Sequence, residues 1–506
     1  MASAILGAGA MECVARRPRA ALAVAGLGLL LGMRALRRSL AGRFRQVPGW
    51  PLVGVLPQVD GGKRLAQCME KWASELGQEG AYEFSLMGTR YVVVCDWELG
   101  KQVFGQRPLN VTRNEAFEHV MPPLVGDGAF SAEGEKWKRH RKITSPAFNS
   151  TAVRGYFPAV RETVGLLVEL LEAGAADGAP PTNFSRLLPL LSMEVVVKVV
   201  FGQESGALRH GQSVVTDLLF EVFAAIQERY LAPVPYWLLP GASLVGLGAG
   251  SGAAPRLKEE IRRLLAGIPE GDTSCLVTRL AEAEGDKLSR QEVEGNLSQF
   301  LLAASETTSS ALAFAFHHLS LQPELQQQVA AEVAEKAPGG VQSQDQLASL
   351  KLVKAVWMET LRLRSPGPML ALSTAVPIEI AGRTVAAGVN IFVLTRYIQN
   401  HTPEAKVLGE DLGEFRPSRW LSANERFVEF ATLDTIAFGH GVRKCPGQRL
   451  AEDEGVLVIA EVLRRFQLEK GADSLAEISA FAQSPAEDVV LKLSRRTAEA
   501  GARGRA

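Results

Sequence analysis

The chain has 506 residues, and its basic and acidic side chains number 55 each, so its formal net charge is zero. Hydrophobic residues make up 47% and charged residues 22%, as in an ordinary globular protein. This composition excludes a disordered chain, a collagen-like repeat and a polytopic membrane protein. The lack of a basic surplus argues against nucleic acid as a partner, because binding to phosphates needs one. The cysteines are too few and too scattered for a disulfide framework.

Residues 1–45 differ from the rest of the chain in charge and hydropathy. They contain a single acidic residue, Glu12, among many arginines, and an uninterrupted apolar stretch runs from Ala20 to Met33. This stretch is shorter than the about 17–25 residues of a typical transmembrane helix, but flanking arginines can reach the membrane interface. We expect residues 1–45 to be a membrane anchor, and an organelle targeting segment is the alternative.

One large domain is predicted behind this segment. Residues 46–58 contain several prolines and predict a stiff linker, residues 59–496 form the domain, and residues 497–506 are expected to be a disordered tail. The glycine-rich stretch 241–252 has no preceding strand and no following Lys-Ser/Thr pair, so it predicts a mobile surface loop rather than a phosphate-binding loop.

Periodicity predicts a mainly α fold with small β-sheets. Most of the domain has helical spacing, and strands are predicted as two hairpins and one C-terminal strand. In chain order we expect a hairpin of 81–87 and 91–95 around Gly88-Thr89, a helix capped by Ser131 that carries the basic run 136–142, helices over 293–321 and 347–363, a hairpin of 376–380 and 389–394, a helix over 448–466, and a strand over 489–493.

A cysteine lies in a glycine-rich loop just before the last predicted helix, in the segment Phe438-Gly-His-Gly-Val-Arg443-Lys-Cys445-Pro-Gly447. Glycines let a backbone turn tightly and approach a flat ligand. The helix N-terminus and the neighbouring cations are expected to lower the pKa of the thiol. A thiolate held in this way is a nucleophile or a soft metal ligand, although most isolated cysteines are simply buried.

This loop resembles the haem-binding signature of the cytochrome P450 family at five specified positions, and further motifs of the family follow in the expected order. The resemblance implies a single large haem domain and haem b with the Cys445 thiolate as its axial iron ligand. It also implies that Arg443 contacts a haem propionate and that Phe438 packs beside the thiolate, while Gly447 completes the signature.

Two helical motifs support the same resemblance. Glu359-Thr-Leu-Arg362 matches the family's Glu-x-x-Arg, whose i, i+3 spacing lets the charges pair, and Arg419 lies in a segment that resembles the one completing a triad with them. Trp137-x-x-x-Arg141 places both side chains on one helix face, and the resemblance implies that they bind a propionate. Without the other motifs, both pairs would be interpreted as surface charges.

The long helix carries Ala303-Ala304-Ser305-Glu306-Thr307, which resembles the family's small-Gly-x-acid-Thr pattern. Phe300, Ala303, Ala304, Thr307 and Ala311 share one helix face, and small residues such as Ala303 leave room above a haem. The resemblance implies that Thr307 hydrogen-bonds dioxygen and that Glu306 supplies protons through water. The alternative is a threonine bonded only to its own helix.

The chain departs from the family pattern at two places. Ala304 stands where the family usually has glycine, so we expect the catalytic efficiency of the enzyme to be altered. Residues 369–372 contain no Arg or His, which the family commonly places there as a further propionate ligand. Haem seating is therefore expected to rest more heavily on Arg141 and Arg443.

The resemblance implies a monooxygenase that inserts one oxygen atom from O2 into an apolar substrate. Electrons would come from an external donor, either NADPH-cytochrome P450 reductase or ferredoxin, which could dock on a basic face formed by Lys351, Lys354, Lys444 and 136–142. The alternatives are a haem-thiolate isomerase or dehydratase, and a non-catalytic haem-binding sensor. With an anchor, the expected location is the endoplasmic reticulum, and the mitochondrion or plastid is the alternative. The distal pocket is expected to draw on 111–130, 218–237, 300–311 and 368–373.

Overall fold

The computed structural model describes residues 43–62, 64–175, 179–231, 252–269, 274–281, 287–402, 405, 408–422, 436–479 and 482–496. The apolar stretch of the predicted anchor, most of the glycine-rich stretch 241–252 and the predicted C-terminal tail lie outside these residues. Among the described helices, none combines the length and the apolar character that a membrane crossing requires.

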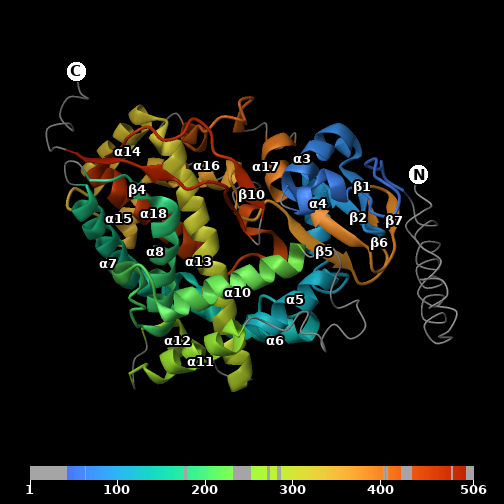
Figure 1. Ribbon diagram of the computed structural model, residues 1–506, viewed down its shortest axis with the longest axis horizontal. Coiled ribbons are helices and arrows are strands. Elements are labelled where there is room, and N and C mark those ends of the chain that lie inside the picture. Colours follow the sequence, from blue (N-terminus) through green and yellow to red (C-terminus); the bar gives the residue numbers. More distant parts are fainter. Residues whose placement is uncertain are drawn as a thin grey trace, which may run out of the picture.

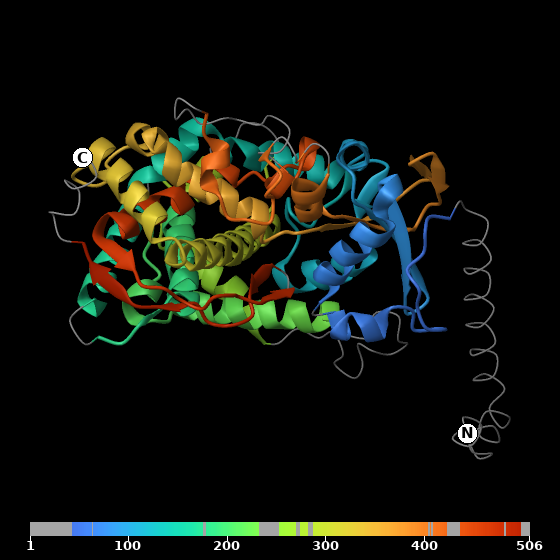
Figure 2. The same ribbon diagram turned by 90° about the horizontal axis from the view of Figure 1, so that it is seen from above.

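Most of the described helices pack around one central helix, and the largest sheet lies at one end of the molecule beside α3 and α4 (Figures 1 and 2). The helices are α3 (Leu65–Leu76), α4 (Trp97–Gly105), α5 (Glu115–Val125), α6 (Gly134–Thr144), α7 (Ser150–Gly174), α8 (Phe184–Phe201), α9 (Ala207–His210), α10 (Val214–Leu231), α11 (Ala253–Ala266), α12 (Leu276–Ala281), α13 (Arg290–Ser320), α14 (Pro323–Lys336), α15 (Gln344–Ser349), α16 (Lys351–Leu363), α17 (Thr395–His401) and α18 (Gln448–Arg465).

Helix α13 is the central helix, and it is buried on most of its circumference. It packs against α8 and α18, and its apolar residues belong to the largest hydrophobic core. The prediction of a long helix over 293–321 is confirmed. The helix begins earlier, at Arg290, because Ser289 and Glu292 form a capping box that satisfies the first backbone N–H groups.

The first predicted hairpin is confirmed, with β1 (Ala81–Leu86) paired to β2 (Thr89–Val94). Its turn lies at Met87-Gly88, one residue earlier than predicted, and both residues have positive φ, at 49° and 74°. This two-residue geometry matches the twist of the flanking strands. The hairpin belongs to a five-stranded sheet of order β1-β2-β8-β5-β3, in which the other strands are β8 (Asn390–Val393), β5 (Leu370–Thr374) and β3 (Val111–Arg113).

The second predicted hairpin is wrong in its pairing. Strand β6 (Ile378–Ile380) pairs with β7 (Arg383–Val385), because Ala381 and Gly382 form a tight turn with φ of 47° and 70°. Residues 390–393 instead form β8, between β2 and β5 in the larger sheet. Burial of Ile391 and Val393 explains this placement, since a strand with such residues needs neighbours that cover it.

The helix predicted over 347–363 is interrupted at Leu350, giving α15 and α16. The carboxylate of Glu332, on α14, accepts hydrogen bonds from the backbone N–H groups of residues 351–353 and so caps the start of α16. Ser131 does not cap α6, whose preceding residue is Glu133. The helix predicted over 448–466 is confirmed as α18 and ends one residue earlier, where Phe466 opens a strand.

The predicted C-terminal strand 489–493 is divided between two small sheets. Strand β12 (Val490–Leu491) pairs with β4 (Thr182–Asn183), and β13 (Leu493–Arg495) pairs with β9 (Phe466–Leu468). A further two-stranded sheet joins β10 (Glu477–Ser479) and β11 (Gln483–Pro485).

The stretch 46–58, predicted to be a stiff linker, packs against β1 in the structure. The backbone N–H of Val47 donates to the carbonyl of Glu83, and that of Val55 donates to the carbonyl of Ser85. Val47 and Val55 are buried. This stretch therefore forms an edge of the domain rather than a spacer in front of it.

Candidate active site

Cys445 lies in the loop that leads into α18. The loop turns on Gly439 and Gly441, which have φ of 76° and 72°, a conformation that other residues rarely adopt. The backbone N–H of Cys445 donates to the carbonyl of Phe438 at 2.9 Å and closes the loop. Gly447 is the residue that precedes α18, so the thiol lies at a helix N-terminus, as predicted.

The Cys445 side chain is exposed, but many protein atoms surround its thiol and displace part of its hydration shell. This loss of hydration raises the pKa of the thiol, against the prediction that the pKa would be lowered. The backbone N–H of Gly447 and the cations Arg141 and Lys444 oppose the rise. Coordination by a metal ion deprotonates a thiol outright, so the free thiol's pKa does not argue against an iron ligand.

The three predicted propionate ligands lie together at this loop. The guanidinium of Arg443 lies 4.5 Å from the centre of the Trp137 ring, and Arg141 donates to the carbonyl of Lys444 at 2.8 Å. The side chain of Arg443 is 4% exposed and forms an ion pair with Glu133. Helix α6 therefore presents Trp137 and Arg141 to the cysteine loop.

Two further arginines, which the sequence motifs did not indicate, join this group. Arg107 donates to Glu133 at 3.2 Å, and Arg113, the last residue of β3, donates to the carbonyl of Phe130 at 2.8 Å. Arg113 is the cross-strand partner of Leu372 on β5. It therefore lies beside β5. The family commonly places a basic propionate ligand on this strand, and this chain has no such residue there.

We call Arg107, Arg113, Arg141 and Arg443 the arginine cluster. Burial lowers the pKa of Arg443 to about 10 and that of Arg113 to about 9, and repulsion from Arg107 acts in the same direction. Attraction to Glu133 raises the pKa of both arginines, but it cancels only part of the decrease. The Nε atoms of Arg107 and Arg443 are buried without a hydrogen-bond partner in the described part of the chain. An excess of buried positive charge fits a ligand that carries two carboxylates, as haem does.

Hydrogen bonds connect the arginine cluster to the central helix through residues 126–132. Arg443 donates to the carbonyl of Ala132 at 2.6 Å. The backbone N–H of Ala129 donates to Asn296 of α13 at 2.8 Å, and that of Phe130 donates to Gln299 at 3.0 Å. These bonds fix α13 relative to the cysteine loop.

Most of the predicted face of α13 remains partly accessible in the middle of this otherwise largely buried helix. Phe300, Ala303, Ala304 and Thr307 are half-buried, whereas Ala311 and most other residues of α13 are buried. Space therefore lies against a face of small side chains. The Thr307 hydroxyl donates to the carbonyl of Ala303 at 2.7 Å, which is the bond within the helix that the sequence left as an alternative. The helix continues through Ala304 without interruption.

Glu306 lies beside Thr307 without an ion-pair partner in the described structure. Burial raises the pKa of its carboxyl to about 7, and its Oε2 atom is buried without a hydrogen-bond partner in the described residues. A carboxyl group with this pKa can both hold and release a proton near neutral pH. A carboxyl group of this kind is what a proton relay requires.

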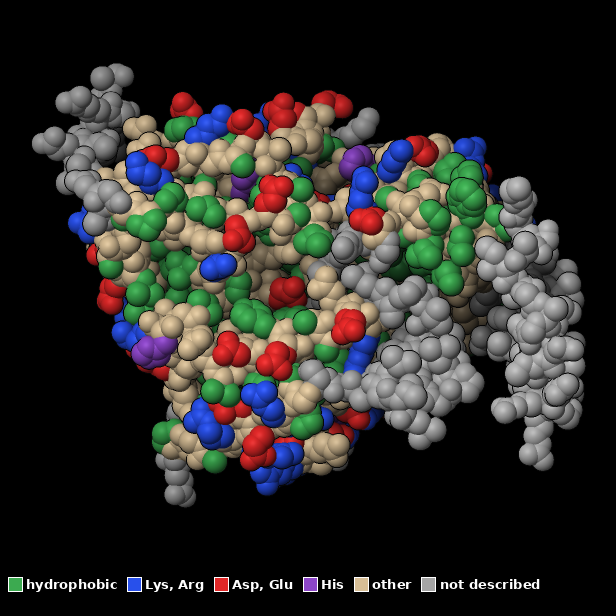
Figure 3. Space-filling view, viewed as in Figure 1, with side chains coloured by type: hydrophobic (Ala, Val, Ile, Leu, Met, Phe, Trp, Pro, Cys, Tyr) green, Lys and Arg blue, Asp and Glu red, His purple; other side chains and the backbone are tan. Residues whose placement is uncertain are grey.

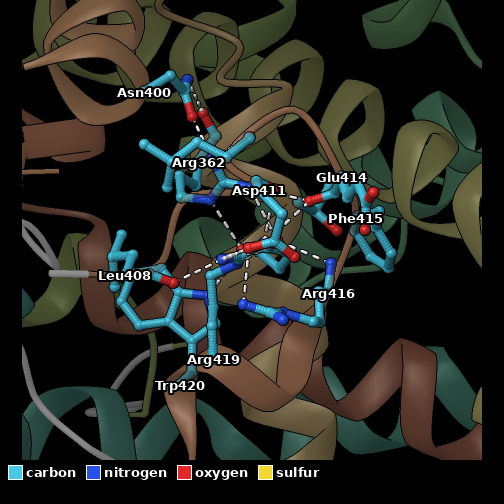
Figure 4. Close-up of polar contacts among 12 residues, drawn as sticks. Arg362, Asn400, Leu408, Asp411, Glu414, Phe415, Arg416, Arg419 and Trp420 are labelled. Carbon is cyan, nitrogen blue, oxygen red and sulfur yellow. Dashed lines mark hydrogen bonds and ion pairs between the residues drawn. The ribbon is translucent and has the colours of Figure 1, made fainter. Parts of the chain in front are cut away.

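The predicted triad is assembled at the end of α16 (Figure 4). Glu359 binds Arg362 through two hydrogen bonds of 2.8 Å and Arg419 through one of 2.8 Å. The indole of Trp420 donates to the same carboxylate at 2.9 Å. These side chains are buried, so each charge depends on its partners for stabilisation.

Backbone carbonyls accept hydrogen bonds from the remaining N–H groups of the two triad arginines. Arg362 donates to the carbonyls of Leu412 and Glu414 at 2.7 and 3.2 Å, and Arg419 donates to that of Leu408 at 2.6 Å (Figure 4). Asn400 also contacts Arg362. The triad therefore fixes the stretch 408–420, which precedes the cysteine loop.

The distal segments named from the sequence fall on α5, α10, α13 and β5, and α5 and α10 both contact α13. Phe223 of α10 is buried, whereas Phe220 is 43% exposed. Residues 232–237 lie outside the described part. In that part, no group of three or more His, Cys, Asp or Glu side chains is placed to hold a metal ion.

Comparison with known proteins places the chain in a family. The cytochrome P450 family model matches residues 45–483. Cyclooctat-9-en-7-ol 5-monooxygenase of Streptomyces melanosporofaciens is 30% identical over 397 residues, which cover 76% of this chain and 82% of that protein. The mitochondrial sterol 26-hydroxylase of Homo sapiens is 26% identical over 78% of this chain and 76% of that protein. A crystal structure of a cytochrome P450 (CYP102L1) has a TM-score of 0.75 at 23% identity, covering 90% of this chain and 99% of that chain.

The chain belongs to the cytochrome P450 family. The expected fold, mainly helical with small sheets in one domain, is confirmed. It is a cytochrome P450 monooxygenase, a family that uses haem b with a cysteine thiolate as axial ligand.

Proposed function

We propose that this monooxygenase inserts one oxygen atom from O2 into an apolar organic substrate, with electrons from an external redox partner. The observation that supports this most directly is the accessible face of α13. There, small side chains adjoin Glu306 and Thr307, and the helix is fixed through residues 126–132 to the loop that carries Cys445. A haem-thiolate isomerase would have no use for this acid–threonine pair.

Haem supplies the activation of dioxygen when it is bound, and we assign the surrounding roles to named side chains. Cys445 is the iron ligand, and Phe438 closes the loop around it. Trp137 and the arginine cluster bind the propionates. Ala303 leaves space at the accessible face of α13.

Two side chains of α13 handle the protons of the reaction. The Thr307 hydroxyl, which donates to the carbonyl of Ala303, would hold and order a water molecule at the accessible face of α13. Glu306 exchanges protons with that water near neutral pH, because burial places the pKa of its carboxyl at about 7.

The electron donor is either NADPH-cytochrome P450 reductase or a ferredoxin, and we place its docking site on the side of the molecule that carries Lys444. Lys351 and Lys354 lie in the first turn of α16, and we assign them to the same docking site. Lys136 and Lys138 already form ion pairs, with Asp127 and Glu135. Docking of this kind weakens as salt is added.

We also propose that residues 1–45 anchor the protein to a membrane, at the endoplasmic reticulum or, as the alternative, in a mitochondrion or plastid. Figure 3 shows hydrophobic side chains gathered at the end of the molecule that holds β1 and β2. Trp50, Leu52 and Met87 are 67%, 90% and 41% exposed. An aromatic side chain among exposed apolar residues suits the membrane interface.

A ligand screen by haem difference spectroscopy tests the proposed function. Apolar compounds that enter the distal pocket should change the Soret band of the purified protein. Those compounds should then give oxygenated products with O2, NADPH and a reductase or ferredoxin system. Rearranged products formed without O2 would identify an isomerase, and spectral binding without consumption of reductant would identify a sensor.

A further inference from the structure

Glu133 occupies the position immediately before α6 but does not cap this helix. At the same position before other helices, Asp96 and Asn114 accept hydrogen bonds from the first backbone N–H groups. The side chain of Glu133 makes no such bond. Its carboxylate instead forms ion pairs with Arg107 and Arg443.

The same carboxylate also accepts a hydrogen bond from the backbone N–H of Arg113 at 3.1 Å. Glu133 raises the pKa of Arg107, Arg113 and Arg443, in opposition to the burial that lowers it. One acidic side chain therefore serves as the counter-charge for three buried cations. It also holds Arg443 in the orientation that places its guanidinium over the Trp137 ring.

An ion pair with Arg443 connects Glu133 to the loop that carries the proposed iron ligand. Arg443 precedes Cys445 by two residues, so their Cα atoms are at most about 8 Å apart, given 3.8 Å for each step along the chain. The side chains of Glu133 and Arg443 are 15% and 4% exposed. Water and salt therefore screen the interaction of Glu133 with the haem site only weakly.

We propose that Glu133 is a positioning residue that orients Arg443 and, as a fixed negative charge, lowers the reduction potential of the haem. The proposal rests on the haem site described above. Reduction adds an electron to the haem, and a nearby buried anion disfavours that step. The arginine cluster acts in the opposite sense, and Glu133 offsets part of its effect. Charge and hydrogen bonding around a haem are recognised determinants of its potential.

The test is the midpoint potential of the holoenzyme, measured by reductive titration. Glu133→Gln removes the charge with little change in shape, and we expect its potential to be more positive than that of the wild type. Glu135→Gln is the matched control, because Glu135 lies two residues further along α6 with its side chain 83% exposed and pairs only with Lys138 among the described residues. Its potential should stay unchanged. Equal potentials for the two variants would overturn the proposal.

Two more variants keep the proposal falsifiable if Glu133→Gln loses haem. Arg107→Gln removes a cation from the same group, so its potential should shift in the negative direction; a positive shift would refute the electrostatic role. Glu133→Asp keeps the charge and should retain haem with a potential close to that of the wild type. The reduced carbon monoxide spectrum of the wild type is recorded first, because a missing thiolate band there would refute the haem site itself.

Discussion

Thiolate ligation by Cys445 has a direct spectroscopic consequence. The reduced carbon monoxide complex of the wild type should show the red-shifted Soret band of a cysteine-ligated haem, and Cys445→Ala should abolish it. Cys275→Ala should keep the band, because Cys275 is buried beside Thr278 at the start of α12. An unchanged band in the Cys445 variant would contradict the assignment.

Thr307→Ala should separate the consumption of reductant from the formation of product. A methyl group cannot hold oxygen or order a water molecule, and loss of one placed proton donor costs about 100- to 10,000-fold in the step it serves. Haem binding should persist, because the Thr307 hydroxyl donates to the carbonyl of its own helix and Thr307 is not one of the proposed haem ligands. The measurement is product formed per reductant consumed, together with hydrogen peroxide released.

Thr307→Ser is the matched control for this experiment, because it keeps the hydroxyl and removes only a methyl group. Its product yield should stay near that of the wild type. If Thr307→Ala gave the same yield as well, the hydroxyl would serve only its own helix, and the proton relay through Glu306 would need another route.

The site residues that the sequence motifs indicated are those with fixed local spacing. Trp137 and Arg141 share a helix turn, and Glu306 and Thr307 are adjacent. Arg107, Arg113 and Glu133 have no such signature. Arg113 reaches the site because β3 pairs with β5, and Glu133 lies between the predicted cap at Ser131 and the basic run 136–142, where its local pattern indicates only the start of a helix. Their roles depend on contacts between segments far apart in the sequence.

At the level of elements, α16 depends on the network around Glu359. Glu359→Gln would leave Arg362 and Arg419 buried without their counter-charge, which costs about 3–5 kcal/mol in comparable cases. Trp420→Phe removes one hydrogen bond to the same carboxylate and should cost about 1.5–3 kcal/mol, the usual value for a bond to a charged group. Chemical denaturation of the two variants should show this order, with early loss of haem from Glu359→Gln. Equal costs would mean that the charge network adds nothing beyond a neutral bond.

Helices α8 and α18 meet at a buried acid that should make stability depend on pH. Glu454 accepts a hydrogen bond from Ser192 at 2.7 Å, and burial raises the pKa of its carboxyl from 4.5 to about 7. The folded state therefore holds this proton more tightly than the unfolded state. The resulting stability is fully present below pH 4.5 and is lost as pH rises through 7, by at most about 3 kcal/mol.

Glu454→Gln should remove this part of the pH dependence. A neutral amide keeps a partner for Ser192 and carries no charge to be desolvated, so the variant should be more stable than the wild type at pH 8 and similar to it at pH 5. Thermal unfolding at the two pH values measures the effect. Glu452→Gln, which changes a less buried acid on the same helix, should follow the wild type; if both variants did, burial of Glu454 would carry no such penalty.

Periodicity predicted the long helices well because their core-facing pattern is local. Helices α13 and α18 were predicted to within a few residues. The interruption at Leu350 was not predicted, since the cap of α16 comes from Glu332 on another helix. The prediction of the second hairpin failed for a related reason. The sequence indicates that residues 390–393 form a strand, but it does not indicate that β2 and β5 are the neighbours of this strand.

At the scale of the whole molecule, the structure moves the N-terminal boundary of the folded domain, and with it the position at which the chain can be shortened. Phe44 is 4% exposed and lies beneath the guanidinium of Arg383, and its backbone N–H donates to Glu83 at 3.2 Å. Residues from 43 onwards therefore belong to the folded domain, although the sequence placed its boundary after a linker.

A chain that begins at Arg43 should lose its membrane association and keep its haem and stability. A chain that begins at Val47 should be less stable by about 3–5 kcal/mol, the usual cost of deleting a buried phenylalanine. Sedimentation with membranes after carbonate extraction measures the first effect, and thermal unfolding measures the second.

If the chain from Arg43 still sedimented with membranes, residues 1–42 would not be the anchor. Leu52→Glu in that shortened chain would then decide whether the surface of Trp50, Leu52 and Met87 holds the membrane, because a charge at a 90% exposed position should release it without unfolding the domain.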